Sequence, residues 1–493
     1  MARRSLQFSI ALALALLVAA CGWFKDKGTL NVALIGSPEE MFAKGIRLTQ
    51  AGQQLRGATV DGLVDFDTTG QVMPALADRW IVTDDGRSYI FRVREGTWPD
   101  GTELTGESVR DALRRTLRGL SGTSLGLDFA PVEDVRAMAG RVVEIRLSAP
   151  MPDLLQLLAQ PELALFRNGH GSGLLKLHRE GDIARLTAVP PEKRGLPAIE
   201  GWMDTVRKLE VRAFPARKAI ALFDEGEVDV VLGGRMEFLP QAADTGPLSR
   251  GTIRMDRVFG LFGMQVRSGE GFLADASRRE ALALAIDRDK LVQPFNVSGW
   301  QATTRIVAPG LPNDPGIAGE RWENLAMPQR QAEAARRVQA WRGANGGAAV
   351  TLSLSLPEGP GADLVFASLR DDLAAAGIGL RRVGPDARAD LEMIDREARY
   401  AGAGWFLNQF NCSLKAGLCS PEADSRVKES LSAADAAGRT ALLARAEADL
   451  TAANVFIPFG APLRWSLVRG NVQGFETNIW GVHPLSALAL ATR

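Results

Sequence analysis

The chain has three histidines, and none of them is placed for chemistry that can be recognised from sequence. His170, His178 and His483 form no i, i+4 pair of the kind that holds a metal ion on a helix. Neither a Gly-x-Ser-x-Gly nucleophile elbow nor a Gly-x4-Gly-Lys phosphate loop occurs. The run 169–173 looks like a phosphate loop but lacks the lysine. The sequence therefore predicts no catalytic residue, no resident metal, no cofactor and no enzymatic activity.

Cys21 ends an N-terminal segment that is typical of exported proteins. Arg3 and Arg4 give the segment a basic start, Phe8–Ala20 is apolar apart from one serine, and small residues precede the cysteine. This pattern predicts a secretory signal peptide. Together with Cys21 it resembles a lipobox, which implies cleavage before Cys21, diacylglycerol on its thiol and acylation of the new amino terminus. The alternative is an uncleaved anchor, but the apolar run is much shorter than the roughly 20 residues that a spanning helix needs.

These signals predict a signal peptide over residues 1–20 and a lipidated tether over 21–27. Several acyl chains anchor a protein stably, so we expect membrane attachment through lipid alone. The sequence predicts a periplasmic, membrane-anchored lipoprotein, and it leaves open whether the inner or the outer membrane holds the anchor.

The two remaining cysteines, Cys412 and Cys419, are separated by six residues. In an oxidising compartment two nearby cysteines usually pair, which favours a disulfide bond that closes this short loop. Two free thiols or a metal pair are the alternatives. A metal site would require further Cys or His ligands nearby, and the sequence has none close to this pair.

Length and charge narrow the kind of protein. At roughly 150 residues per domain, 493 residues suggest about three domains or subdomains. The 58 basic and 58 acidic residues balance, and removal of a signal peptide with two arginines leaves the rest slightly acidic. A nucleic-acid partner would require a basic surface, so none is expected. No other segment is long and apolar enough to span a membrane, so we expect a soluble body.

Hydrophobic periodicity predicts an α/β chain with more than one lobe. Strands are expected where apolar residues alternate or run together, and helices where they recur at helical spacing. The cleanest unit is a strand Val350–Leu356, a helix Ala362–Ala376 and a strand Leu380–Val383, which indicates a βαβ unit. Other strands are expected at 30–35, 88–94, 143–147, 206–214 and 228–232, and other helices after 105 and 215 and at 278–286, 422–436 and 440–452.

The segment 73–117 carries the most specific pattern. It places Pro-x-Leu-Ala-x-x-Trp before a turn, an alternating strand with Trp98 near its end, an Asp100-Gly101 turn, and Ser108-Val109 at a helix start. This order closely resembles the signature of the extracytoplasmic solute-binding proteins of family 5, the peptide, nickel and oligopeptide type. Further segments resemble family motifs and occur in the family's order along the chain. They are 61–64, which precedes this segment, and 171–175, 223–229, 278–292 and 456–458, which come after it. The resemblance covers about residues 28–485.

The resemblance implies a two-lobed fold of the periplasmic binding protein type (type II, with an extra accessory domain). By analogy, lobe I uses residues 28–58, 169–265 and 458–493, the accessory domain uses 59–168, and lobe III uses 266–457. A small solute binds between lobes that close by a hinge motion. The closed protein, expected to be a monomer, then docks on the permease subunits of an ABC importer.

The resemblance also implies where a ligand binds. Peptide-binding members have a Trp followed closely by an Asp that anchors the ligand's amine. Here Trp405 fits, but the Asp position holds Asn408, which can offer only a weaker, uncharged hydrogen bond. The ligand is therefore a small solute that is peptide-like, neutral, acidic or differently oriented. Trp405 is alternatively a core aromatic.

Other candidate ligand-binding residues come from the family's cleft-lining segments. They are Phe262, Gly263 and Met264 at a crossover, Trp300 in a loop before two prolines, and Gly36 and Ser37 after the first strand. Ligands of open α/β sheets bind beyond the carboxyl ends of parallel strands, which favours Gly36 and Ser37 independently.

The function that follows is capture of a peptide or peptide-like solute for an ABC importer. The alternative is a lipoprotein of the same descent that has lost its ligand and serves a structural or assembly role in the envelope. A cleft filled by the protein's own side chains would favour that alternative.

Overall fold

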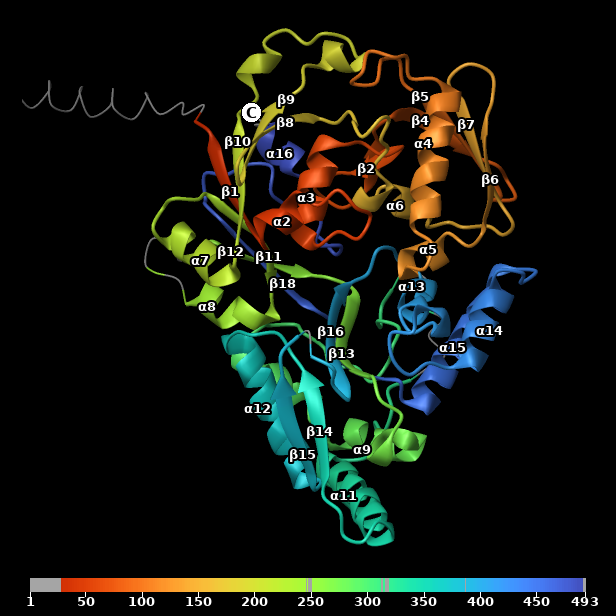
Figure 1. Ribbon diagram of the computed structural model, residues 1–493, viewed down its shortest axis with the longest axis vertical. Helices are drawn as coiled ribbons and strands as arrows, with labels where there is room; N and C mark the ends of the chain where they lie inside the picture. The colour runs from red at the N-terminus through yellow and green to blue at the C-terminus, as the bar shows by residue number, and fades with distance from the viewer. Residues whose placement is uncertain are drawn as a thin grey trace, which may run out of the picture.

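The computed structural model describes residues 28–244, 246, 251–311, 314, 319–385 and 387–490. The expected signal peptide, Cys21 and the tether lie outside the described residues. The described chain forms sheets of seven, five, four and two strands, with helices packed around them (Figure 1). This is the mixed α/β class that the sequence predicts.

The seven-stranded sheet has the order β12-β18-β11-β1-β10-β9-β8. Its central strand β1 pairs in parallel with β10 and β11, and the outer pairs are antiparallel. The sheet is assembled from distant parts of the chain, and its strands are β1 (Leu30–Ile35), β8 (Leu175–Glu180), β9 (Ile183–Ala188), β10 (Leu209–Phe214), β11 (Val230–Arg235), β12 (Ile253–Arg257) and β18 (Leu463–Val468).

Helices cover both faces of this sheet because β1 is apolar on both sides. Leu30, Val32 and Leu34 pack in one core with α2 (Pro38–Met41), α3 (Gln50–Thr59) and α16 (Leu485–Ala489). Ala33 belongs to a second core with α7 (Ala216–Asp224) and α8 (Leu239–Ala243). The alternation of side chains along the strand therefore separates two helical layers.

The four-stranded sheet β4-β5-β7-β6 is antiparallel and stands beside the first sheet, at the upper right of Figure 1. Its strands and helices are β4 (Ala77–Val82), β5 (Ser88–Val93), α4 (Gly106–Gly119), α5 (Ser124–Asp128), β6 (Val132–Ala137), β7 (Val142–Leu147) and α6 (Leu154–Leu158). Helix α4 starts after residue 105 as expected, and Thr105 begins it with a capping box in which Ser108 is the partner. Trp98 is fully buried here and donates from Nε1 to Oγ of Ser108 at 2.9 Å. The strands β2 (Val64–Phe66) and β3 (Val72–Pro74) pair separately.

The five-stranded sheet has the order β15-β14-β16-β13-β17 and forms the lower body in Figure 1. Its strands are β13 (Gly260–Val266), β14 (Val350–Ser355), β15 (Ile378–Val383), β16 (Leu391–Glu397) and β17 (Phe456–Gly460). The helices around it are α9 (Ala276–Ala285), α10 (Arg288–Val292), α11 (Met327–Ala344), α12 (Pro360–Ala375), α13 (Ala403–Asn408), α14 (Pro421–Ser430) and α15 (Ala436–Ala453). β14 and β15 are parallel and flank α12, as the βαβ prediction requires.

Two short connections join the large sheets. The chain leaves the seven-stranded sheet at β12 and enters β13 across residues 258–259, and it returns from β17 to β18 across 461–462. β13 and β17 pair with each other inside the five-stranded sheet. The expected lobe I included residues 260–265 and 458–460, but the hydrogen bonds of these residues belong to the five-stranded sheet.

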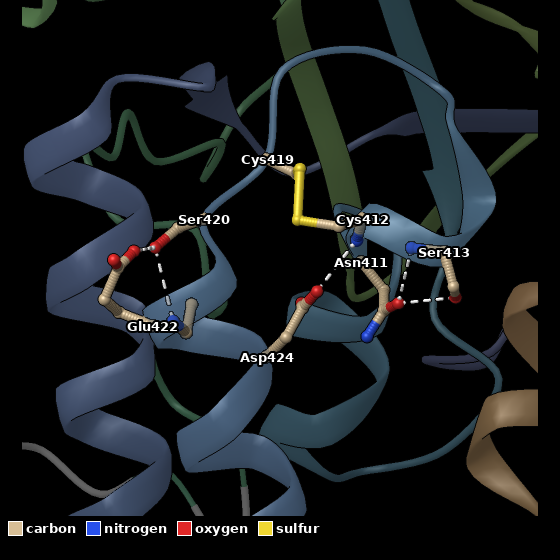
Figure 2. The surroundings of a disulfide bond; sticks show 8 residues. Asn411, Cys412, Ser413, Cys419, Ser420, Glu422 and Asp424 are labelled. Atoms are coloured by element: carbon tan, nitrogen blue, oxygen red, sulfur yellow. Dashed lines mark hydrogen bonds between the residues drawn. A yellow bond between two sulfur atoms is a disulfide. The ribbon is translucent and has the colours of Figure 1, made fainter.

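A disulfide bond joins Cys412 and Cys419, the pairing that the sequence favours (Figure 2). The bonded loop is held at both ends by polar contacts. Asp424 accepts a hydrogen bond from the backbone N–H of Cys412 at 2.9 Å, and Ser420 begins α14 by capping the N–H of Ala423. The disulfide therefore fixes the chain between α13 and α14.

Replacing both cysteines by serine should lower the free energy of unfolding by about 2 kcal/mol, because the unfolded chain regains the freedom of a short loop. Chemical denaturation with and without a reducing agent measures this. The reductant should destabilise the wild-type protein and leave the double variant unchanged; equal stability of the two proteins under oxidising conditions would contradict the prediction.

Candidate functional site

A cavity of about 1320 Å³ lies where the large sheets and the four-stranded unit meet. From the seven-stranded side it is lined by the end of β1, by α2 and α3, and by the residues after β11. From the five-stranded side it is lined by β16 and the start of α13. Residues 120–125 and 159–162 of the four-stranded unit close a third wall. The carboxyl ends of the parallel strands β1 and β11 open into this space, where ligands of α/β sheets usually bind.

Three of the expected ligand-binding residues line this cavity: Gly36, Ser37 and Trp405. Ser37 caps α2 by accepting from the N–H of Glu40, and Glu40 bonds back to the N–H of Ser37 at 2.8 Å. This reciprocal capping fixes the turn after β1. Trp405 is only 3% exposed and its ring stands edge-on to Phe406, with centroids 4.8 Å apart. Trp405 is thus both a core aromatic and part of the cavity wall.

Asn408 is placed differently. It is buried but does not line the cavity, and its Nδ2 donates to Oδ1 of Asp128 at 2.8 Å. The hydroxyl of Tyr400 donates to the same oxygen at 3.0 Å. Burial raises the pKa of Asp128 to about 7, although both hydrogen bonds lower it. The amide at this position therefore binds a carboxylate of the protein itself, at the end of α5.

The other four expected residues lie near the connections between the sheets. Phe262 and Trp300 line a second cavity of about 610 Å³, and Trp300 donates from Nε1 to the carbonyl of Ala461 at 2.8 Å. Gly263 and Met264 line neither cavity, and both are inside β13. Gly263 allows close strand contact, because a Cβ there would lie 2.3 Å from the carbonyl oxygen of Ile457.

A polar latch, which we define as Arg399, Glu162, Gln160 and Gln53, crosses the cavity wall. Arg399 follows β16 and donates to Oε1 of Glu162 at 2.9 Å and to Oε1 of Gln160 at 2.8 Å. Gln53 of α3 donates to the same Glu162 oxygen at 2.9 Å. The four residues come from three segments, and the latch joins all three walls. Sequence analysis missed it, because its members share no motif.

A charge cluster, which we define as Arg235, Glu237, Asp395, Glu397 and Arg464, lies at the junction of the large sheets. Arg464 of β18 is 2% exposed and contacts two carboxylates of β16, with Nη1 2.7 Å from Oδ1 of Asp395 and Nε bonded to Glu397. Burial alone would raise the pKa of Glu397, but the charges of Arg464 and Arg235 lower it to about 2.

Arg235 of β11 donates to the backbone carbonyl of Asp395 at 3.1 Å. Two arginines of one sheet are therefore bonded to one strand of the other. Within the described residues, no group of three or more His, Cys, Asp or Glu side chains is placed to hold a metal ion.

Comparison with known proteins agrees with this architecture. The sequence profile of bacterial extracellular solute-binding proteins, family 5 (middle part), matches residues 71–411. The chain belongs to this family. Solute-binding proteins, not enzymes, make up the family.

Curated relatives extend the likeness to the whole chain. It is 23% identical to a probable di/tripeptide-binding protein 5 of Pseudomonas aeruginosa, over 94% of this chain and 95% of that protein. It is 24% identical to the peptide transport periplasmic protein SapA of Salmonella typhimurium, over 85% of this chain and 84% of that protein. Over 21% of this chain and 23% of the relative, it is 33% identical to a probable deoxycholate-binding periplasmic protein of Escherichia coli.

Solved structures show the same fold. OppA of Haemophilus influenzae, in complex with RPPGFSPFR, superposes with a TM-score of 0.78 over 94% of this chain and 99% of that one, at 18% identity. AgaA of A. tumefaciens, in complex with agropinic acid, superposes with a TM-score of 0.69 over 94% of this chain and 98% of that one, at 16% identity. The fold is therefore the two-lobed binding-protein fold with an accessory domain, as expected.

Asp128→Asn should remove a pH-dependent loss of stability. Folding raises the pKa of Asp128 from 3.8 to about 7. Between these two pH values the folded protein holds a proton that the unfolded chain releases. The stability of the wild-type protein therefore falls as the pH rises through this range. The stability of the variant relative to wild type should rise by about 3 kcal/mol between about pH 4.5 and pH 8. Chemical denaturation at both pH values measures the stability of the variant relative to wild type, with the exposed substitution Asp371→Asn as control. The same relative stability at both pH values would refute the prediction.

Glu162→Gln should loosen the polar latch, because it removes the charge from a buried hydrogen-bond acceptor. The lost contact is worth about 1.5–3 kcal/mol, enough to shift the protein towards an open form with a larger radius of gyration. Small-angle X-ray scattering of the ligand-free protein measures this. Glu180→Gln, in an exposed ion pair with Arg185 on the outer strands, is the matched control. Identical scattering from Glu162→Gln and wild type would show that the latch does not hold the lobes together.

Proposed function

We propose that this protein is the substrate-binding component of an ABC importer and captures a peptide or peptide-like small solute in the cavity between its lobes. The observation that carries the proposal is the cavity itself, about 1320 Å³ at the carboxyl ends of β1 and β11. That volume exceeds the 300–1,000 Å³ of ordinary small-molecule pockets. Relatives named as di/tripeptide-binding and peptide transport proteins support the ligand class.

The proposal includes the division into three parts, with its boundaries adjusted to the sheets. Lobe I comprises the seven-stranded sheet and its helices, the accessory domain comprises 59–168, and lobe III begins after residues 258–259 and ends before 461–462. The two connections are the hinge. The cavity stays between the lobes whichever boundary residues are chosen.

The anchor and the partner are also part of the proposal. Cleavage before Cys21 and its lipidation would hold the monomeric protein at the periplasmic face of a membrane, where the closed form meets permease subunits. Among the described residues, no helix combines the length and hydropathy needed to cross a bilayer. The protein acts by binding and release, without catalysis.

The alternative is a lipoprotein that lost its ligand and took a structural role in the envelope. That alternative predicts a cleft filled by the protein's own side chains. The described side chains leave the cavity unfilled, which favours ligand binding.

Two linked experiments test the function. Mass spectrometry of the protein purified without unfolding should detect a co-purified solute at near-equimolar amount. A thermal-shift screen of di- and tripeptides should then raise the melting temperature, because ligand at 100-fold above its Kd stabilises the folded state by about 2.7 kcal/mol. No co-purified solute and no shift from any peptide would favour the structural alternative.

A further inference from the structure

With every group ionised, the charge cluster at the hinge would hold one more negative charge than positive charges. Its three carboxylates are Glu237, Asp395 and Glu397, against the two guanidinium groups of Arg235 and Arg464. Glu397 is satisfied, since Arg464 donates to it and Gln50 approaches its Oε1 at 3.5 Å. Glu237 and Asp395 are therefore the carboxylates of the cluster that have the fewest bonded partners. Buried charges without a full set of partners are costly, so such an excess is unusual unless something neutralises it.

Asp395 has unused bonding capacity inside the cavity. It lines the cavity and its side chain is 7% exposed. Arg464 lies 2.7 Å from Oδ1 as an ion pair, yet Oδ2 is buried and accepts no hydrogen bond from any described residue. A buried carboxylate oxygen without a donor is rare in folded proteins. An oxygen in this state is suited to a donor that arrives with a ligand.

Glu237 lies in the short helix η4 (Met236–Phe238) directly after β11 and lines the same cavity. Burial raises the pKa of Glu237, and the charge of Asp395, which lines the same cavity, raises it further. Arg235 and Arg464 act on Glu237 as charges and not as hydrogen-bond donors. Among the described residues, no cation is hydrogen-bonded to the Glu237 carboxylate.

The loop after β14 extends this acidic wall. Gly359 packs against η4, since a Cβ there would lie 2.6 Å from the carbonyl oxygen of Glu237. The preceding residue, Glu358, also lines the cavity. Two cavity-lining arginines, by contrast, are already engaged: Arg399 is bonded to Glu162, and Arg396 donates to Oε1 of Gln409 at 3.2 Å.

We infer that Glu237 and Asp395 form a subsite for a positively charged group of the captured solute, an ammonium or a guanidinium. The inference rests on the proposed function and specifies its ligand. A cation at this place would donate to Oδ2 of Asp395 and to Glu237, and it would balance the charge of the cluster. The subsite lies at the junction of the sheets, so the same cation would contact β16 of one lobe and the residues after β11 of the other. Asn408 offers no such charge, and its amide is already bonded to Asp128.

Calorimetric titration with two matched probes tests the inference. Ala-Lys-Ala carries two ammonium groups, and N-acetyl-Ala-norleucine-Ala has none while keeping a similar size. The wild-type protein should bind the cationic peptide at least about tenfold more tightly. Glu237→Gln should reduce this preference at least about tenfold. Asp395→Asn should do the same, and Asp371→Asn, an exposed substitution outside the cavity, should keep the preference.

Glu237→Gln is the decisive variant, because Asp395→Asn also disturbs the buried Arg464 pair and can unfold the protein. Equal binding of the two peptides by wild type would overturn the subsite and leave the proposed function standing. So would an unchanged preference in folded Glu237→Gln. If neither peptide binds, both the subsite and the peptide part of the proposed function fail.

Discussion

The contact on which the arrangement of the lobes depends is the one between Arg464 and two carboxylates of β16. Arg464 belongs to the seven-stranded sheet, and Asp395 and Glu397 belong to the five-stranded sheet. A guanidinium buried to this degree cannot lose its partners cheaply, because an uncompensated buried charge costs about 3–5 kcal/mol. The ion pairs therefore fix where the sheets meet, next to the two short connections.

The opposite side of the cavity is held by weaker, more exchangeable contacts. The polar latch around Glu162 joins the four-stranded unit to both large sheets, and Asp128 of that unit binds Asn408 and Tyr400. A firm junction beside the two connections and polar contacts at the rim are consistent with the proposed opening and closing about those connections. In such a protein a ligand that contacts both lobes stabilises the closed form through its own binding energy.

Sequence reasoning predicted the local elements well, because apolar periodicity and caps act over a few residues. β1, the start of α4 after residue 105 and the βαβ unit of β14, α12 and β15 agree with expectation. Motif order predicted the family and the fold. Gly36, Ser37 and Trp405 line the cavity as expected, but the rest of its lining could not be predicted, because it depends on contacts between distant segments. Asn408, for example, bonds to Asp128, 280 positions away. Arg464 carried no signal, since a lone arginine in an apolar strand shows no partner in sequence.

The central claim is that the cavity between the lobes holds a solute against both sheets. A crystal structure of the protein together with the solute that co-purifies with it tests this claim most directly. The account predicts electron density for a small molecule in contact with Trp405, with a nitrogen within hydrogen-bond distance of Oδ2 of Asp395. A cavity filled by water or by the protein's own side chains, with the solute bound elsewhere, would contradict it.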